Sequence, residues 1–183
     1  MLIWIIIGII IVLALIFVGM YNSFIKLKNS CDEAYSTMDV YLKKRFDLIP
    51  NLVETVKGYA AHEKETLQNV IAARNNLQNA STPEEKLAGE NALQGTLKTL
   101  FAVAEAYPDL KASTNFIQMQ NDLKSMESEI EGSRRYYNGT VKYHNNAVSV
   151  FPANLIAGQF NFTKEPLFEI PDETKREKPT VEF

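Results

Sequence analysis

Residues 1–20 read MLIWIIIGIIIVLALIFVGM and contain no charged side chain. Most of them are Leu, Ile, Val or Phe, each of which favours membrane insertion by about 0.3 to 0.6 kcal/mol near the bilayer centre. A helix of this length rises about 30 Å, which matches the hydrocarbon core of a bilayer. The stretch therefore predicts a transmembrane helix.

A secretory signal peptide is the main alternative for this stretch. Signal peptides begin with cationic residues, have an apolar core of about 7 to 15 residues and end at a small-residue cleavage site. Here no Lys or Arg precedes the apolar core, the core is longer, and the sequence GMYN at residues 19–22 fits the cleavage pattern poorly. We expect residues 1–21 to form an uncleaved anchor.

Cations near the span predict its orientation. Lys26 and Lys28 follow within ten residues of it, so the positive-inside rule predicts a single-pass protein with its C-terminal body in the cytoplasm. The single cysteine, Cys31, agrees with a reducing compartment and excludes an intramolecular disulfide. The net charge is −3 with cations interspersed among acids, so we expect no nucleic-acid partner.

A heptad pattern begins directly after the span. Its apolar or small positions are Phe24, Leu27, Cys31, Ala34, Met38 and Tyr41. No glycine or proline separates them from the span, which predicts one rod of roughly 70 Å ending before Pro50. Pro50 lacks an amide donor and disfavours helix at the preceding residue, so we expect the rod to kink or restart there.

Three further helical stripes follow, over residues 51–77, 83–107 and 113–147. The strongest boundary is TPEE at residues 82–85, where Thr82 can cap the helix and Glu85 can complete a capping box. Four such stripes can bury their apolar faces only against one another. The fold class predicted is all-α: a transmembrane helix that continues into an elongated antiparallel four-helix bundle over residues 22–157.

The tail, residues 158–183, contains prolines and charged residues. Its first half is too apolar for a simple linker because of Phe160, Phe162 and Phe168, which we expect to dock on the bundle or on a neighbouring copy. We expect its last dozen residues to be disordered.

The chain contains few residues arranged for chemistry. His62 and His144 are far apart, and neither has the second ligands of a zinc or di-iron motif. No glycine-rich phosphate loop or nucleophile elbow is present. The sequence predicts no enzyme activity, no catalytic residue, no metal and no cofactor.

Polar residues at two places suggest either a register-fixing ion pair or a docking surface. The first place holds Arg45, Asp47, Pro50 and Asn51, and the second holds Arg134, Arg135, Tyr137 and Asn138. Arginine can pair with a carboxylate across helices, and Tyr and Arg are also common interface anchors. Both interpretations stay open at this point.

Three segments resemble the bacterial LemA family: DVYLKKRFDLIPNLVETVKGY at residues 39–59, RRYYN at 134–138 and FPANLIA at 151–157. Gly139 and Thr140 depart from the family's usual sequence, and a mid-helix glycine costs about 1 kcal/mol relative to alanine. The resemblance implies an N-terminal anchor, a cytoplasmic helical bundle and no established enzymatic activity. Relatives associated with magnetosome membranes and envelope stress suggest a role in organising membranes.

These observations predict a membrane-anchored structural protein that self-assembles through its bundle and organises or shapes the bacterial inner membrane. Its partners would be membrane lipids and further copies of the same chain. The alternative is an adaptor that presents a bundle face to a membrane protease or signalling partner. An enzyme or metal protein is the third hypothesis.

Overall fold

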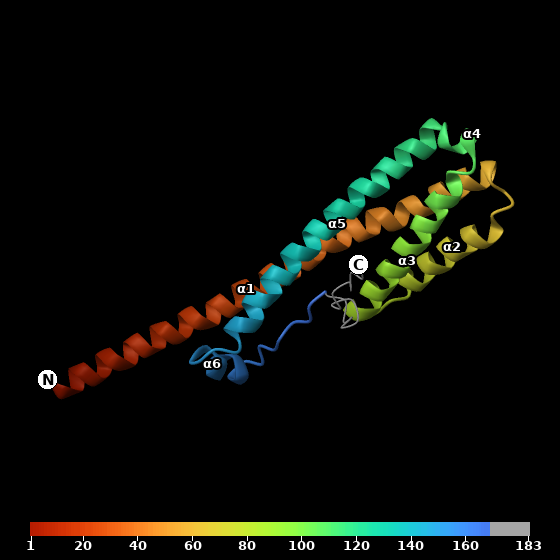
Figure 1. Cartoon of the computed structure of the whole chain (residues 1–183). Helices are drawn as coiled ribbons and strands as arrows, with labels where there is room; N and C mark the ends of the chain where they lie inside the picture. The colour runs from red at the N-terminus through yellow and green to blue at the C-terminus, as the bar shows by residue number, and fades with distance from the viewer. Residues whose placement is uncertain (169–183) are drawn as a thin grey trace, which may run out of the picture. The chain divides into compact units, whose positions relative to one another are not determined.

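The computed structural model describes residues 1–168, whose path is shown in Figure 1. All regular secondary structure within this range is helical, as the sequence predicts. The helices are α1 (Leu2–Tyr59), α2 (Lys64–Gln78), α3 (Pro83–Ala104), α4 (Pro108–Lys111), α5 (Thr114–Ala147) and α6 (Ala153–Gln159). Residues 169–183 of the predicted tail, including its expected disordered end, lie outside the described range.

Helix α1 begins in the apolar stretch and continues into the body without a break, which confirms the predicted continuity. Of the two expectations for Pro50, the restart is wrong, because α1 runs through this proline to Tyr59, and the kink stays a prediction. Pro50 cannot donate to the Phe46 carbonyl four residues earlier. Arg74 of α2 supplies the missing donor, with its Nε 3.4 Å from that carbonyl oxygen and its guanidinium 3.8 Å from the centre of the Phe46 ring.

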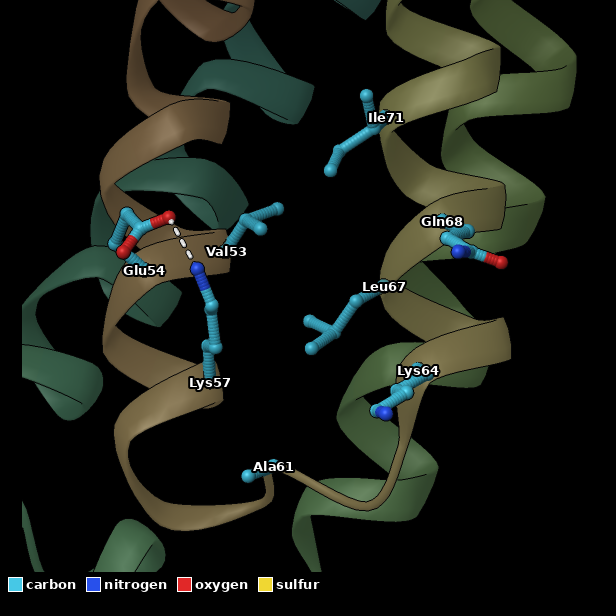
Figure 2. Close-up of a pocket in the computed structure, with 8 residues that line it drawn as sticks. All are labelled: Val53, Glu54, Lys57, Ala61, Lys64, Leu67, Gln68 and Ile71. Carbon is cyan, nitrogen blue, oxygen red and sulfur yellow. Dashed lines mark hydrogen bonds and ion pairs between the residues drawn. The ribbon is translucent and has the colours of Figure 1, made fainter.

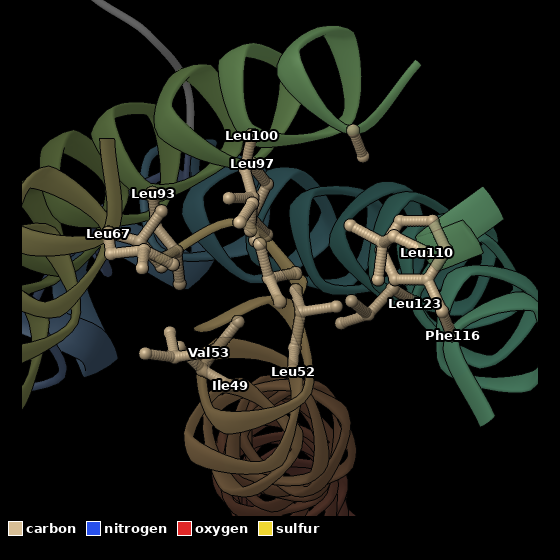
Figure 3. Close-up of a cluster of buried hydrophobic side chains, with 14 of the residues drawn as sticks. Ile49, Leu52, Val53, Leu67, Leu93, Leu97, Leu100, Leu110, Phe116 and Leu123 are labelled. Atoms are coloured by element: carbon tan, nitrogen blue, oxygen red, sulfur yellow. The ribbon is translucent and has the colours of Figure 1, made fainter. Parts of the chain in front are cut away.

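The described chain divides into two compact units, and α1 and α5 contribute to both. Unit 1 comprises Met1–Lys44 and Ser125–Leu167, and unit 2 comprises Arg45–Lys124 together with Phe168. Within unit 2, apolar side chains from α1, α2, α3, α4 and α5 share one core, as Figure 3 shows. The four-helix arrangement over all of residues 22–157 stays a prediction.

Helices α2 and α3 pack against each other in unit 2 and are joined by a short connection, so they run antiparallel (Figure 1). The predicted boundary at Thr82 is confirmed. The Thr82 hydroxyl accepts from the Glu85 amide at 3.1 Å, and the Glu85 carboxylate accepts from the amides of Ser81 and Thr82. These backbone donors lower the pKa of Glu85, because they favour its charged form.

The core of unit 1 forms where α5 lies against the first part of α1. The Tyr35 and Tyr137 rings meet edge to face with centroids 5.7 Å apart. Cys31 is buried, and burial raises the pKa of its thiol, which is the reverse of what a reactive cysteine needs. The other buried side chains along these two helix faces are Phe24, Ala34, Met38, Leu42, Ile130, Ser133, Val141 and His144.

Helix α6 ends in a Schellman motif that turns the chain back toward α1. Asn161 adopts a left-handed conformation with φ 57°, which asparagine tolerates better than most residues. The Phe162 amide donates to the Ala157 carbonyl at 2.9 Å, and the Asn161 amide donates to Gly158 at 3.5 Å. The residues after this turn, 162–168, have no regular secondary structure.

Candidate functional site

The apolar start of α1 is the clearest functional surface. Residues 1–19 are all exposed, including Trp4 at 76% and Leu15 at 67% of their full accessible area. Among the described residues, α1 is the one helix with a window long and apolar enough to cross a membrane, and none of that window is buried. An exposed stretch of this kind differs from the core helix of a soluble protein, which hides its apolar side chains.

Aromatic side chains attach the C-terminal segment of unit 1 to α1 around the end of the apolar stretch. The Phe160 ring lies 5.7 Å from Phe17 and 4.9 Å from Tyr21, measured between centroids. The Phe162 ring lies 5.7 Å from Tyr21 and 5.1 Å from Phe24. Two of the three predicted docking residues of the tail, Phe160 and Phe162, therefore pack on α1 of the same chain.

Polar side chains of α5 hold the next residues of the same segment through its backbone. The Tyr137 hydroxyl donates to the Pro166 carbonyl at 2.9 Å, and His144 Nε2 donates to the Thr163 carbonyl at 2.9 Å. Asn145 makes two bonds of 2.8 Å with the amide and carbonyl of Glu165. Backbone groups that lack a strand or helix partner are thus satisfied by side chains.

Charge adds to this attachment. Lys28 of α1 forms an ion pair of 2.6 Å with the Glu165 carboxylate, and this bond raises the pKa of Lys28. Burial raises the pKa of Tyr137 to about 12, because the charged phenolate is disfavoured away from water. Segment 160–167 is therefore an ordered part of unit 1.

Unit 2 contains a buried ion pair between α1 and α3. Arg45 and Glu90 form it with only 3% and 1% of their side chains exposed. A buried charge pair is costly to break, because removing one partner leaves the other charge unsolvated. This contact fits the register-fixing interpretation of Arg45.

The predicted interaction residues fall into three groups by burial. Arg45, Tyr137 and Phe168 are buried; Arg134, Asn138 and Phe162 are partly buried; Asp47, Pro50, Asn51, Arg135 and Phe160 are exposed. Exposed Arg135 pairs with Glu131 one turn earlier at 3.0 Å. Their role in binding a partner stays a prediction.

Sequence reasoning missed the partners of several of these residues. Glu90 lies three residues after Leu87 and three before Leu93, on a stripe of apolar residues. A carboxylate at such a position was the sequence signal that could have identified the partner of Arg45. Asn145 and Glu165 gave no such signal, because their contact joins a side chain to a backbone far along the chain.

A cleft of about 360 Å³ opens between α1 and α2 in unit 2 (Figure 2). Val53, Leu67 and Ile71 give it an apolar floor, as the close-up shows. Lys57, which bonds Glu54 at 3.4 Å, and Lys64 stand at its edge. The cleft suits an apolar side chain flanked by a carboxylate. No group of three or more His, Cys, Asp or Glu that could hold a metal occurs within residues 1–168.

These features define an all-helical, membrane-associated protein. The chain belongs to the LemA family, whose profile matches residues 34–183. Protein LemA of Metamycoplasma hominis is 26% identical over 172 residues, which cover 92% of this chain and 77% of that protein. Magnetosome protein MamQ 2 of Paramagnetospirillum magneticum is 25% identical over 81% of this chain, and MamQ of Magnetospirillum gryphiswaldense is 24% identical over the same share. The chain spans 64% of the length of these two MamQ proteins.

Proposed function

We propose that this protein is a membrane-anchored structural protein that self-assembles through its helical body and organises or shapes the bacterial inner membrane. The apolar start of α1 would be a single-pass anchor, with the body in the cytoplasm. Lys26 and Lys28 after the span support that orientation through the positive-inside rule. The resemblance to magnetosome proteins supports a role at a membrane.

The observation that carries the self-assembly proposal is a second stripe on α5, outside the core of unit 1. Gly132, Tyr136, Gly139 and Tyr143 follow one another at heptad spacing. Tyr136 and Tyr143 are 60% and 75% exposed. We call these four residues the α5 stripe.

The glycines of the α5 stripe are not required by close packing within their own chain. A Cβ added at Gly132 or Gly139 would meet nothing within 4 Å. Each mid-helix glycine nevertheless costs about 1 kcal/mol relative to alanine. Close approach of a second helix would account for this cost, because tyrosine side chains of one copy can fill the spaces over the glycines of another.

Sizing of the full-length protein in detergent tests the proposal. We expect an oligomer at micromolar concentration, and a strict monomer would reject it. The Gly139→Leu variant should raise the melting temperature, because leucine favours helix, while reducing assembly. Gly95→Leu is the matched control: Gly95 of α3 likewise has nothing within 4 Å of an added Cβ, so this change should stabilise the protein without affecting the size of the oligomer.

The adaptor hypothesis is a second candidate, and the cleft between α1 and α2 favours it. Photo-crosslinkers placed in cells at Tyr143 and at Ile71, which lines the cleft, separate the two roles. Self-crosslinks from Tyr143 support a scaffold. A single heterologous band from Ile71, without self-crosslinks, supports an adaptor.

A further inference from the structure

Helix α6 and its flanking residues present large apolar side chains to solvent. Phe151 is 79% exposed and Leu155 65%, while Val150 and Phe160 are 44% and 43% exposed. We call these four residues the α6 patch. The opposite face of α6 is already occupied, since Ala157 is buried with Phe24 and Val148 in a small core.

Contacts along α1 place the α6 patch at the end of the apolar stretch. Moving backwards along the chain, Glu165 pairs with Lys28, Phe162 packs on Phe24, and Phe160 packs on Tyr21 and Phe17. Each step lies nearer the N-terminus of α1. Phe17 belongs to the uncharged residues 1–20, so α6 lies where that apolar surface ends.

We propose that α6 is a second membrane contact, which lies in the lipid interface beside the span. It rests on the proposed function, because it requires the start of α1 to cross the bilayer. Amphipathic helices that lie in the interface bury their apolar face about 5–10 Å into the boundary between headgroups and acyl chains. The α6 patch continues the apolar surface of α1, so one lipid surface covers both.

The composition around α6 supports lipid as the occupant. Residues 145–163 contain no charged side chain. Exposed lysines bound this region, Lys142 before it, Lys164 after it and Lys26 on α1, where ammonium groups could meet lipid phosphates. Tyr21 is an aromatic residue of the type enriched at membrane interfaces.

A second contact would limit the freedom of the span. One helix in a bilayer can tilt and rotate, and its orientation is set by interfacial anchors and by packing against neighbours. Because ring contacts and the Lys28–Glu165 ion pair tie segment 160–167 to α1, insertion of α6 would hold unit 1 at a defined height and rotation.

Lipid-attached quenchers test the proposal in full-length protein reconstituted into vesicles. Trp4 is the one tryptophan of the chain and reports on the span. In a Trp4→Phe background, Phe151→Trp and Leu155→Trp report on the α6 patch. Tyr136→Trp is the matched control: Tyr136 is 60% exposed, and its neighbour Tyr137 packs on Tyr35, about 20 Å along α1 from Tyr21.

We expect shallow brominated lipids to quench the Phe151→Trp and Leu155→Trp variants but not Tyr136→Trp. Acrylamide, a quencher dissolved in water, should quench Tyr136→Trp more strongly than Phe151→Trp or Leu155→Trp. Adding Leu155→Asp to the Phe151→Trp variant should reduce its quenching by brominated lipids to that of the Tyr136→Trp control. If Phe151→Trp behaves like Tyr136→Trp while lipids quench Trp4 in the wild-type chain, α6 is not a membrane contact and the anchor stands. If lipids do not quench Trp4, the anchor and the α6 contact both fail.

Discussion

The ion pair between Arg45 and Glu90 permits a quantitative test of what holds α1 against α3. Glu90→Leu removes a carboxylate that is 1% exposed and leaves the Arg45 guanidinium, 3% exposed, inside unit 2. An uncompensated buried charge costs about 3–5 kcal/mol, so we expect this loss in the free energy of unfolding. Arg45→Met should cost a similar amount, because it leaves the carboxylate alone.

The double variant Arg45→Met with Glu90→Leu should be far more stable than the sum of the single changes predicts. Two apolar side chains of similar volume remove both charges, and such replacements are neutral or stabilising by about 1–4 kcal/mol. The coupling energy from the double-mutant cycle should therefore be several kcal/mol. Urea unfolding of the full chain in detergent micelles, followed by circular dichroism, measures the free energy of unfolding of the natural chain, the two single variants and the double variant.

The exposed pair of Arg135 with Glu131 provides the control. It has a distance of 3.0 Å, but its side chains are 73% and 64% exposed, so Glu131→Leu should change stability by less than about 0.5 kcal/mol. If Glu90→Leu costs no more than this control, or if the two single changes are additive in the double variant, the buried pair does not hold these helices together.

Three further predictions concern backbone groups and a tyrosine. Pro50→Ala should raise the free energy of unfolding by about 2 kcal/mol, because it restores a helical donor to the Phe46 carbonyl. Arg74→Met should lower the free energy of unfolding by about 1 kcal/mol in the natural chain and by less in the Pro50→Ala background. Equal losses in both backgrounds would contradict this. Asn161→Val should lower the free energy of unfolding by about 1–2 kcal/mol, because a β-branched residue is strained at positive φ. Asn161→Gly should change it by no more than a few tenths of a kcal/mol. Thermal melts of both variants check this. The pKa of Tyr137 is about 12 in the folded chain and about 10 in the unfolded chain, so the neutral phenol favours the folded state below pH 10. This contribution to stability should disappear as the pH rises from about 10 to about 12. Urea unfolding at stepped pH should therefore show a smaller loss of unfolding free energy over this range for Tyr137→Phe than for the natural chain.

Local patterns in the sequence correctly predicted the all-helical class, the cap at Thr82 and the burial of the central apolar stripe. Leu93, Leu97 and Leu100 recur at helical spacing and are all buried in the core of unit 2. The capping box at Thr82 and Glu85 was predictable because both residues lie within one turn. Periodicity and capping need no knowledge of distant residues.

The incorrect prediction of a helix restart at Pro50 has a physical reason. Proline removes a donor within the helix, and a local rule then favours a break. The replacement donor is Arg74, which lies 28 residues from Phe46 in sequence and reaches its carbonyl only after α2 has folded back along α1. A tertiary contact therefore overrides the local preference.

The apolar length of residues 1–20, the continuity of α1 from that stretch as far as Pro50 and the all-helical class were determined by the sequence itself, because each depends on composition and short-range spacing. Tertiary structure alone decided which groups meet across long separations. It paired Arg45 with Glu90, directed Asn145 to the backbone of Glu165, and brought Phe160 to Phe17. Such contacts depend on the path of the chain in space, and no periodic pattern encodes that path.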